Sequence, residues 1–256
     1  MSRDAAGYAV IDGLGTPEEQ WQAWPGLQAL PAVQATALVP PGSRLVVLAP
    51  HPDDEVLAVG GLIAQLAAAG RELLLVAVTD GTASHPGSAR WTPAALAATR
   101  PGETADALRR LGVGEVPTLR LGLPDSDVAE APVIAAVAPS LRDRDVLVVT
   151  WRHDGHPDHE AVGRAGAALA AATGAPLLEV PVWTWHWARP GDARVPWERA
   201  RRVELDAALL ARKRAAVEAY ASQLGEDAAL PLGAVLPPPV LARLLRPAEV
   251  VLGGEG

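Results

Sequence analysis

Residues 45–61, LVVLAPHPDDEVLAVGG, decide the fold. The first residues of this stretch are apolar and β-favouring, which indicates a buried strand of about five residues. Directly after it, residues 51–55 place four groups that can bind a proton or a metal within five positions. Apolar residues then recur at near-helical spacing as far as Leu66, so we expect a helix that begins around Asp53 or Asp54. The chemistry therefore lies on a strand-to-helix turn, at the strand end where open α/β sheets bind their ligands.

The rest of the chain continues this alternation of strand and helix. Apolar runs at 72–79, 116–121, 145–150 and 177–183 predict strands, and helical patterns at 93–111, 128–141 and 205–223, with an alanine-rich helix ending near 173, lie between or after them. We expect Pro101 to split the second helix, and residues 225–256 to be coil around one short helix near 240–245. Regular alternation of this kind favours an α/β fold with a mostly parallel sheet and helices on both faces.

Residues 1–40 do not share the alternation of strand and helix patterns that the rest of the chain shows. Thr16 is placed to cap a helix that carries Trp21 and Trp24 and ends before Pro25. We predict an N-terminal arm, residues 1–40, packed by its tryptophans on a single domain formed by residues 41–256. The alternative is an arm that walls a substrate cleft.

Composition excludes several classes of protein. The chain has 256 residues, 49% of them apolar, which is enough for one sizeable core. Its net charge of −8, without a long basic run, argues against a nucleic-acid or anionic-membrane partner. Because there is no cysteine, disulfides, thiolate catalysis and cysteine zinc sites are excluded.

Two further patterns in the sequence bear on where we expect the protein to be found. No run reaches the roughly 18 apolar residues of a membrane span. The first residues lack the apolar region of a signal peptide, so we expect a cytoplasmic protein. The number of subunits, including a homo-oligomer, stays open.

Two ionisable clusters follow strands that lie about a hundred residues apart in the sequence. The first is His51-Pro52-Asp53-Asp54, and the second is residues 153–159, HDGHPDH. In a parallel sheet both turns open on the same edge, so the clusters can face each other across one crevice. His51, Asp54 and His159 could then supply the two imidazoles and one carboxylate that a hydrolytic metal site needs.

Two further residues of these clusters suit the chemistry of such a site. Asp53 is placed to take a proton from a water activated by the metal. His156 could meet the charge that develops on a carbonyl oxygen, or protonate the leaving group. Each residue alone has a plainer interpretation, such as a helix cap for Asp53 or Asp54 and a solvated turn for His156 and His159. The H-P-D pattern repeated at two strand ends favours the metal site.

Candidates for substrate contacts are Asp80, Arg100 and Trp185. Asp80 ends the second predicted strand and should border the same crevice, while Arg100 could equally pair with Glu103 on its own helix. Trp185 belongs to the segment 183–187, WTWHW, whose tryptophans would share one face at strand spacing. They could stack on a sugar, but core packing against the arm is slightly favoured. Two further histidines, His85 and His153, are assigned to loops.

The motifs APHPDDE (49–55) and HPDHEAVG (156–163) resemble the paired signatures of the LmbE-like, or PIG-L, metal-dependent N-acetylglucosaminyl deacetylases. The resemblance covers residues 44–224, and the two H-P-D motifs are specific only in combination. The first motif of the family usually follows alanine directly, whereas Pro50 intervenes here. Residues 1–40 and 183–187 lie outside the family's core signature.

The resemblance implies a Rossmann-like fold and hydrolysis of an N-acetylated amino sugar or its conjugate. It implies zinc held by His51, Asp54 and His159, with Asp53 as the general base and His156 stabilising the tetrahedral intermediate. Two histidines and a carboxylate also suit Fe²⁺ or another divalent ion. An amidase for a larger N-acyl group on a glycosylated metabolite and a non-catalytic carbohydrate-binding protein remain alternatives. Dinucleotide binding is weaker, because no G-x-G-x-x-G follows the first strand.

Overall fold

A computed structural model describes residue 11 and residues 13–253 of the protein. The first ten residues and Asp12 of the predicted N-terminal arm lie outside the described residues. Seven strands form one sheet in the order β3-β2-β1-β4-β5-β7-β6. They are β1 (Arg44–Ala49), β2 (Glu72–Thr79), β3 (Thr118–Leu123), β4 (Asp145–Thr150), β5 (Leu177–Val180), β6 (Ala200–Glu204) and β7 (Ala248–Gly253).

Strands β1 to β5 are parallel, as the sequence predicts, with Val46 opposite Leu74 of β2 and Leu147 of β4. The chain leaves β1 in one direction to build β2 and β3, and then returns to the other side of β1 to build β4 and β5. The strand order therefore reverses between β1 and β4. Ligands of open α/β sheets bind at such a switch point, and both H-P-D turns follow these two strands.

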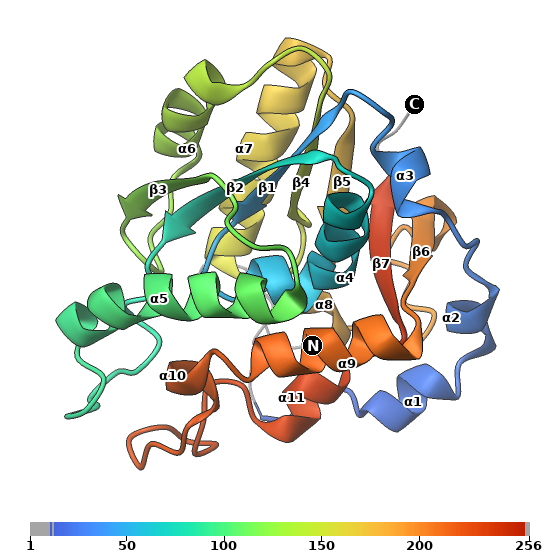
Figure 1. The fold of residues 1–256 in the computed structure, drawn as a ribbon. Coiled ribbons are helices and arrows are strands. Elements are labelled where there is room, and N and C mark those ends of the chain that lie inside the picture. Colours follow the sequence, from blue (N-terminus) through green and yellow to red (C-terminus); the bar gives the residue numbers. More distant parts are fainter. Residues whose placement is uncertain (1–10, 12, 254–256) are drawn as a thin grey trace.

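Helices cover both faces of the sheet (Figure 1). The α-helices are α1 (Glu18–Gln22), α2 (Pro25–Ala29), α3 (Ala35–Leu38), α4 (Asp54–Ala68), α5 (Pro93–Leu111), α6 (Glu130–Val137), α7 (Pro157–Thr173), α8 (Thr184–Trp187), α9 (Ala207–Val217), α10 (Ala221–Leu224) and α11 (Pro238–Ala242). Short 3₁₀ turns lie at Ala138–Ser140 and Trp197–Arg199. Helices α6 and α7 lie on one face, and α4, α5 and α9 lie on the other.

The apolar sequence of β1 accounts for this layering. Leu45 and Val47 belong to the core cluster under α4, whereas Val46 and Leu48 belong to the cluster under α7. Successive strand residues point to opposite faces, so a strand that is apolar throughout is buried on both sides. Both helix layers are thus anchored on the strand that carries the first H-P-D turn.

The C-terminal third departs from the prediction. Strand β7 replaces expected coil, strand β6 lies where no element is predicted, and β7 pairs antiparallel with both β5 and β6. Helix α5 is continuous through Pro101, so the expected split is wrong. Arg100, before the proline, donates to Asp53, and Glu103, after the proline, accepts from Ser222. These bonds to other elements offset the backbone hydrogen bond that Pro101 cannot make.

The segment 183–187 is also not a strand. Strand β5 ends at Val180, and residues 184–187 form the short helix α8. The side chains of the three tryptophans therefore diverge: Trp183 lines a cavity, Trp185 is buried against Trp21, and Trp187 lies parallel to Trp151.

The described part of the N-terminal arm lies against α8 and β6. Thr16 does not cap α1 as predicted, because Pro17 occupies the N-cap position; the Thr16 hydroxyl donates to the carbonyl of Ala188 (2.6 Å). Trp21 donates to the Trp185 carbonyl, and Trp24 stacks edge-on against Trp197 after α1 has ended. The backbone of residues 31–33 bonds to Arg202 of β6. The division of the chain at residue 40 stays a prediction.

None of the helices in the described part of the chain is long and apolar enough to cross a membrane.

Candidate metal centre

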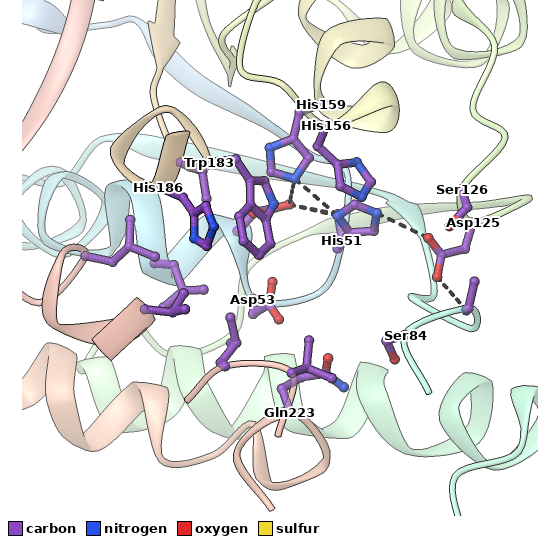
Figure 2. A pocket seen from close by; sticks show the side chains of 18 of the residues that line it. His51, Asp53, Ser84, Asp125, Ser126, His156, His159, Trp183, His186 and Gln223 are labelled. Atoms are coloured by element: carbon purple, nitrogen blue, oxygen red, sulfur yellow. Dashed lines mark hydrogen bonds and ion pairs between the residues drawn. The ribbon is translucent and has the colours of Figure 1, made fainter. Parts of the chain in front are cut away.

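The two H-P-D turns meet at the carboxyl edge of β1 and β4 (Figure 2). His51 Nδ1 lies 3.3 Å from His159 Nε2 and 3.4 Å from Asp54 Oδ2, and the last two atoms are 3.3 Å apart. In a tetrahedral zinc site with bonds of about 2.0–2.1 Å, neighbouring ligand atoms lie about 3.3–3.4 Å apart. The spacing of these three atoms therefore fits a single metal ion.

Hydrogen bonds on the outer side of each ring support the same arrangement. His159 Nδ1 lies 2.8 Å from the carboxylate of Asp154, and His51 Nε2 lies 3.0 Å from Asp158 and 3.2 Å from Asp125. A ring nitrogen beside a carboxylate carries the proton, so in the neutral rings the two facing nitrogens are bare acceptors. Two acceptors and a carboxylate oxygen around one point are a donor set that suits a divalent ion.

The pKa values of these groups reflect the same electrostatics. Burial alone would raise the pKa of Asp54, but the charges of His159 and His51 and their hydrogen bonds hold it well below its ordinary value. Burial opposes protonation of His159, yet Asp54 and Asp154 raise its pKa to about 9. The carboxylates thus make this end of the cavity attractive to positive charge.

Two wider groups overlap with this triad. His51 with His156 and His159, and His51 with Asp125 and Asp158, each bring three ligand atoms within 4.8 Å of one another. The carboxylate of Asp158 also accepts hydrogen bonds from the backbone N–H groups of Ser126 (2.7 Å) and Val128 (3.1 Å). We favour the triad with Asp54, because its three spacings are nearly equal and fit a tetrahedral ion, whereas Asp158 and Asp125 lie at hydrogen-bond distance from His51 Nε2 (3.0 and 3.2 Å).

Asp53 lies beside the triad in an unusual backbone conformation. Its φ is 136°, which for a residue with a side chain costs on the order of 1–3 kcal/mol. Its carbonyl accepts the first bonds of α4, but its side chain makes no capping hydrogen bond and instead pairs with Arg100 (2.9 Å). Burial raises the pKa of Asp53 to about 8, although the charge of Arg100 opposes the shift. Asp53 therefore occupies the N-cap position with its backbone, as the plainer interpretation has it, but its side chain does not cap the helix.

Asp53 is held in place by Glu55 and Tyr220. The backbone N–H of Asp53 donates to Glu55 Oε2 (3.0 Å), and the Tyr220 hydroxyl donates to Glu55 Oε1 (2.6 Å). Both partners are buried, so the bonds that maintain the strained turn are shielded from water.

His156 faces the cavity from the start of α7. Its Nδ1 accepts a hydrogen bond from the backbone N–H of Asp158 (3.2 Å), so the proton of the neutral ring is on Nε2. Burial and the positive charges of His51 and His159 lower the pKa of His156 to about 3. A neutral ring with a free N–H is suited to donate to an oxygen that gains negative charge.

One cavity joins these groups, and Figure 2 shows Trp183, His186 and Gln223 around it. It is lined by His51, Asp53, Asp54, Leu57, Ala83, Ser84, Arg100, Asp125, Ser126, His156, His159, Val182, Trp183, His186, Gln223, Val235, Leu236, Val240, Arg243 and Leu244. All five predicted metal and catalytic residues lie in this lining.

The predicted substrate contacts are placed differently from one another. Arg100 lines the cavity through its pair with Asp53, and it does not pair with Glu103, which binds Ser222 instead. Asp80 pairs with Arg120 and lines a separate hollow beyond Pro52. Trp185 is buried away from the cavity, because α8 turns its ring toward Trp21; Trp183 takes the place predicted for it.

The two loop histidines also lie outside the cavity lining. His85 is buried beside Trp91 and bonds to the Ser84 hydroxyl (2.9 Å), and the exposed His153 contacts Trp151.

Sequence reasoning missed the residues that hold the histidines. Asp154 is fully buried and accepts hydrogen bonds from the backbone of Val182, Trp183 and Thr184 as well as from His159. Asp125 and Asp158 support His51 in the same way. A signal was present, since Asp154 and Asp158 belong to the second cluster, but spacing alone does not show which carboxylate faces the cavity.

Residues 46–170 match the family model for PIG-L, described as GlcNAc-PI de-N-acetylase. The chain is also similar to deacetylases named for 1D-myo-inositol 2-acetamido-2-deoxy-alpha-D-glucopyranoside. It is 31% identical to the Rhodococcus opacus protein over 186 residues, which is 62% of this chain and 59% of the relative. It is 32% identical to the Mycolicibacterium gilvum protein over 170 residues, 56% of this chain and 58% of the relative. The matches therefore span less than two thirds of these relatives.

Solved structures share the fold. The N,N'-diacetylchitobiose deacetylase of Pyrococcus horikoshii has a TM-score of 0.58 at 21% identity, over 71% of each chain. A triple mutant of a deacetylase of teicoplanin biosynthesis has a TM-score of 0.59 at 21% identity, over 82% of this chain and 97% of the other. The solved structures thus support the fold, and the stretch that matches the PIG-L, or LmbE-like, family model, just under half of the chain, carries both H-P-D turns.

Proposed function

We propose that the protein is a metal-dependent hydrolase that removes the N-acetyl group from an N-acetylated amino sugar or amino-sugar conjugate. The observation that carries the proposal is the triangle of His51 Nδ1, Asp54 Oδ2 and His159 Nε2, with sides of 3.3–3.4 Å, in the wall of a cavity. The names of the curated relatives supply the amino-sugar class.

We assign the metal to His51, Asp54 and His159, with Zn²⁺ as the first candidate and Fe²⁺ or another divalent ion as the alternative. Such an ion supplies a Lewis acid that polarises the amide carbonyl and acidifies a water molecule. Asp154 and Asp158 fix the ring orientations from outside, as carboxylates commonly do for histidine ligands.

The protein's own groups then move the protons. Asp53 takes a proton from the attacking water and passes it to the amide nitrogen as the C–N bond breaks. Nε2–H of His156 donates to the carbonyl oxygen as negative charge develops on it. Arg100 holds the Asp53 carboxylate in position and keeps it from capping α4.

A second candidate is hydrolysis of a larger N-acyl group from a glycosylated metabolite. The apolar part of the cavity lining favours it, which includes Val182, Trp183, Val235, Leu236, Val240 and Leu244. Comparing kcat/KM for N-acetyl and N-octanoyl glucosamine derivatives separates the two: the first proposal predicts the higher value for the acetyl compounds.

The test is acetate release from N-acetylglucosamine conjugates by metal-loaded protein, chelator-treated protein and protein reloaded with metal. The proposal predicts release that is lost with the chelator and restored by metal. A metal-loaded protein that binds these sugars without releasing acetate would instead support a non-catalytic carbohydrate-binding role.

A further inference from the structure

One buried cation differs from the others. Five arginine and lysine side chains are buried in the described part of the chain: Arg44, Arg100, Lys213, Arg243 and Arg246. Four of them have a carboxylate within 2.9 Å, namely Asp145, Asp53, Glu249 and Glu18 in that order. No carboxylate of the described residues lies within 4.0 Å of Arg243. A buried charge is costly unless it is paired, so this exception calls for an explanation.

The contacts of Arg243 leave part of its guanidinium available. Nη1 donates to the carbonyls of Leu14 (2.7 Å) and Thr16 (3.0 Å), and Nη2 lies 3.0 Å from His186 Nδ1. A guanidinium has five N–H donors, so these bonds leave two, one of them on Nε. Burial, followed by the charge of Arg246, lowers the pKa of Arg243 to about 10, so the side chain is still charged at neutral pH.

Arg243 lines the same cavity as the candidate metal site. A row of rings connects the two: His156 lies parallel to Trp183 with ring centres 6.4 Å apart, and Trp183 meets His186 edge-on at 5.7 Å. Figure 2 shows His186 beyond Trp183, on the side away from His51. The lining also holds apolar side chains, including Val182, Val235 and two residues close to Arg243 in the sequence, Val240 and Leu244. A charge–charge contact in such surroundings is stronger than in water.

We propose that Arg243 binds a carboxylate carried by the substrate, on the part of the conjugate that extends beyond the amino sugar. Two free N–H groups on one planar cation match the two oxygens of a carboxylate, and the bond would supply the anion that the described residues do not. The apolar residues of the cavity lining would cover the part of the conjugate that joins the carboxylate to the sugar. This inference rests on the proposed function for the position of the sugar at the metal end.

The experiment compares two aryl N-acetylglucosaminides that differ only in a para carboxylate or a para carboxamide. Acetate release is measured with metal-loaded protein, and calorimetry measures binding of the two corresponding free amines, which needs no turnover. We expect the carboxylate to be preferred about 10-fold or more in both kcat/KM and affinity, since hydrogen bonds to charged groups are the stronger ones.

Variants separate recognition from folding. Arg243→Gln should bring the carboxylate-to-carboxamide ratio close to one, and Arg243→Lys should keep part of the preference because it keeps the charge. Arg246→Gln is the matched control: Arg246 is also buried, but it pairs with Glu18 and does not line the cavity, so its loss should lower stability and keep the ratio.

The outcomes are distinct. A wild-type ratio near one, in turnover and in binding, overturns the inference even if Arg243→Gln does not fold. Release of acetate from both compounds without discrimination rejects the carboxylate site and leaves the proposed function standing. A binding preference without any acetate release rejects the proposed function and keeps the carboxylate site.

Discussion

The two H-P-D turns share a sequence and a place at the sheet edge, but they present different groups to the cavity. In the first turn the aspartate, Asp53, lines the cavity. In the second turn the equivalent aspartate, Asp158, is fully buried and bonds to His51 and to two backbone N–H groups. The carboxylate of Asp53 is thus placed for chemistry in the cavity, and that of Asp158 for support of His51.

The difference comes from where each helix begins. Helix α4 begins at Asp54, so Asp53 precedes it and adopts its strained conformation. Helix α7 begins at Pro157, two positions earlier in the motif, so Asp158 lies inside the first turn and His156 becomes the N-cap. Both motifs have proline at this position, Pro52 and Pro157, so the proline alone does not set the helix start. A repeated motif therefore marks a site, while the helix start decides which atoms face it.

The largest expected effect is on Asp53. Asp53→Asn removes the only proposed proton acceptor at the amide, so kcat should fall by about 10²–10⁴-fold, the usual contribution of general acid–base catalysis. Metal content, measured by elemental analysis, should stay at the wild-type value. Asp143→Asn, on an exposed loop at the far end of β4, is the control and should leave kcat unchanged. A wild-type kcat in Asp53→Asn would contradict the role of Asp53 in proton transfer, and with it the difference in role between Asp53 and Asp158.

The next effect concerns His156, the N-cap of the second turn. His156→Ala should lower kcat by about 10²–10³-fold, as loss of one oxyanion donor does elsewhere, with metal still bound. His156→Gln, whose amide can donate from a similar position, should recover part of the rate. A His156→Ala protein that loses its metal would show that the wider group of three histidines, and not the triad with Asp54, forms the site.

A smaller effect is expected from the supporting carboxylate of the second turn. Asp154→Asn should weaken metal affinity by about 10–100-fold, since outer carboxylates orient and activate histidine ligands. Thr184→Val is the matched control, because it removes one hydroxyl donor to the same carboxylate (2.6 Å) and leaves the bond to His159. Equal metal affinities for the two variants, in titrations at a temperature where both are folded, would contradict the orienting role.

The sequence predicts the parallel half of the sheet and the meeting of the two turns, because both depend on local patterns. The apolar runs of β2 and β4 have the predicted bounds, and strand ends in a parallel sheet open on one edge. The pairing of β7 between β5 and β6 was not predictable, since Pro231 and the prolines at 237–239 suggest coil and the partner strands are far away in the sequence. Side-chain direction was also out of reach at 183–187, where helical and strand spacing place Trp185 on different sides.

The roles of individual carboxylates and cations in the cavity depend on contacts between distant segments. Arg243 is one arginine among many in the sequence. That it has no carboxylate partner among the described residues emerges only when α11, α8 and the N-terminal arm come together. The same holds for Asp125, which reaches His51 from the loop after β3.

The central claim is that one metal ion joins the two turns, and anomalous X-ray scattering from zinc-loaded crystals tests it most directly. The account predicts a single peak within bonding distance, about 2.0–2.2 Å, of His51 Nδ1, Asp54 Oδ2 and His159 Nε2. A peak on the other side of the ring, between His51 Nε2, Asp125 and Asp158, or no peak at either position, would contradict it.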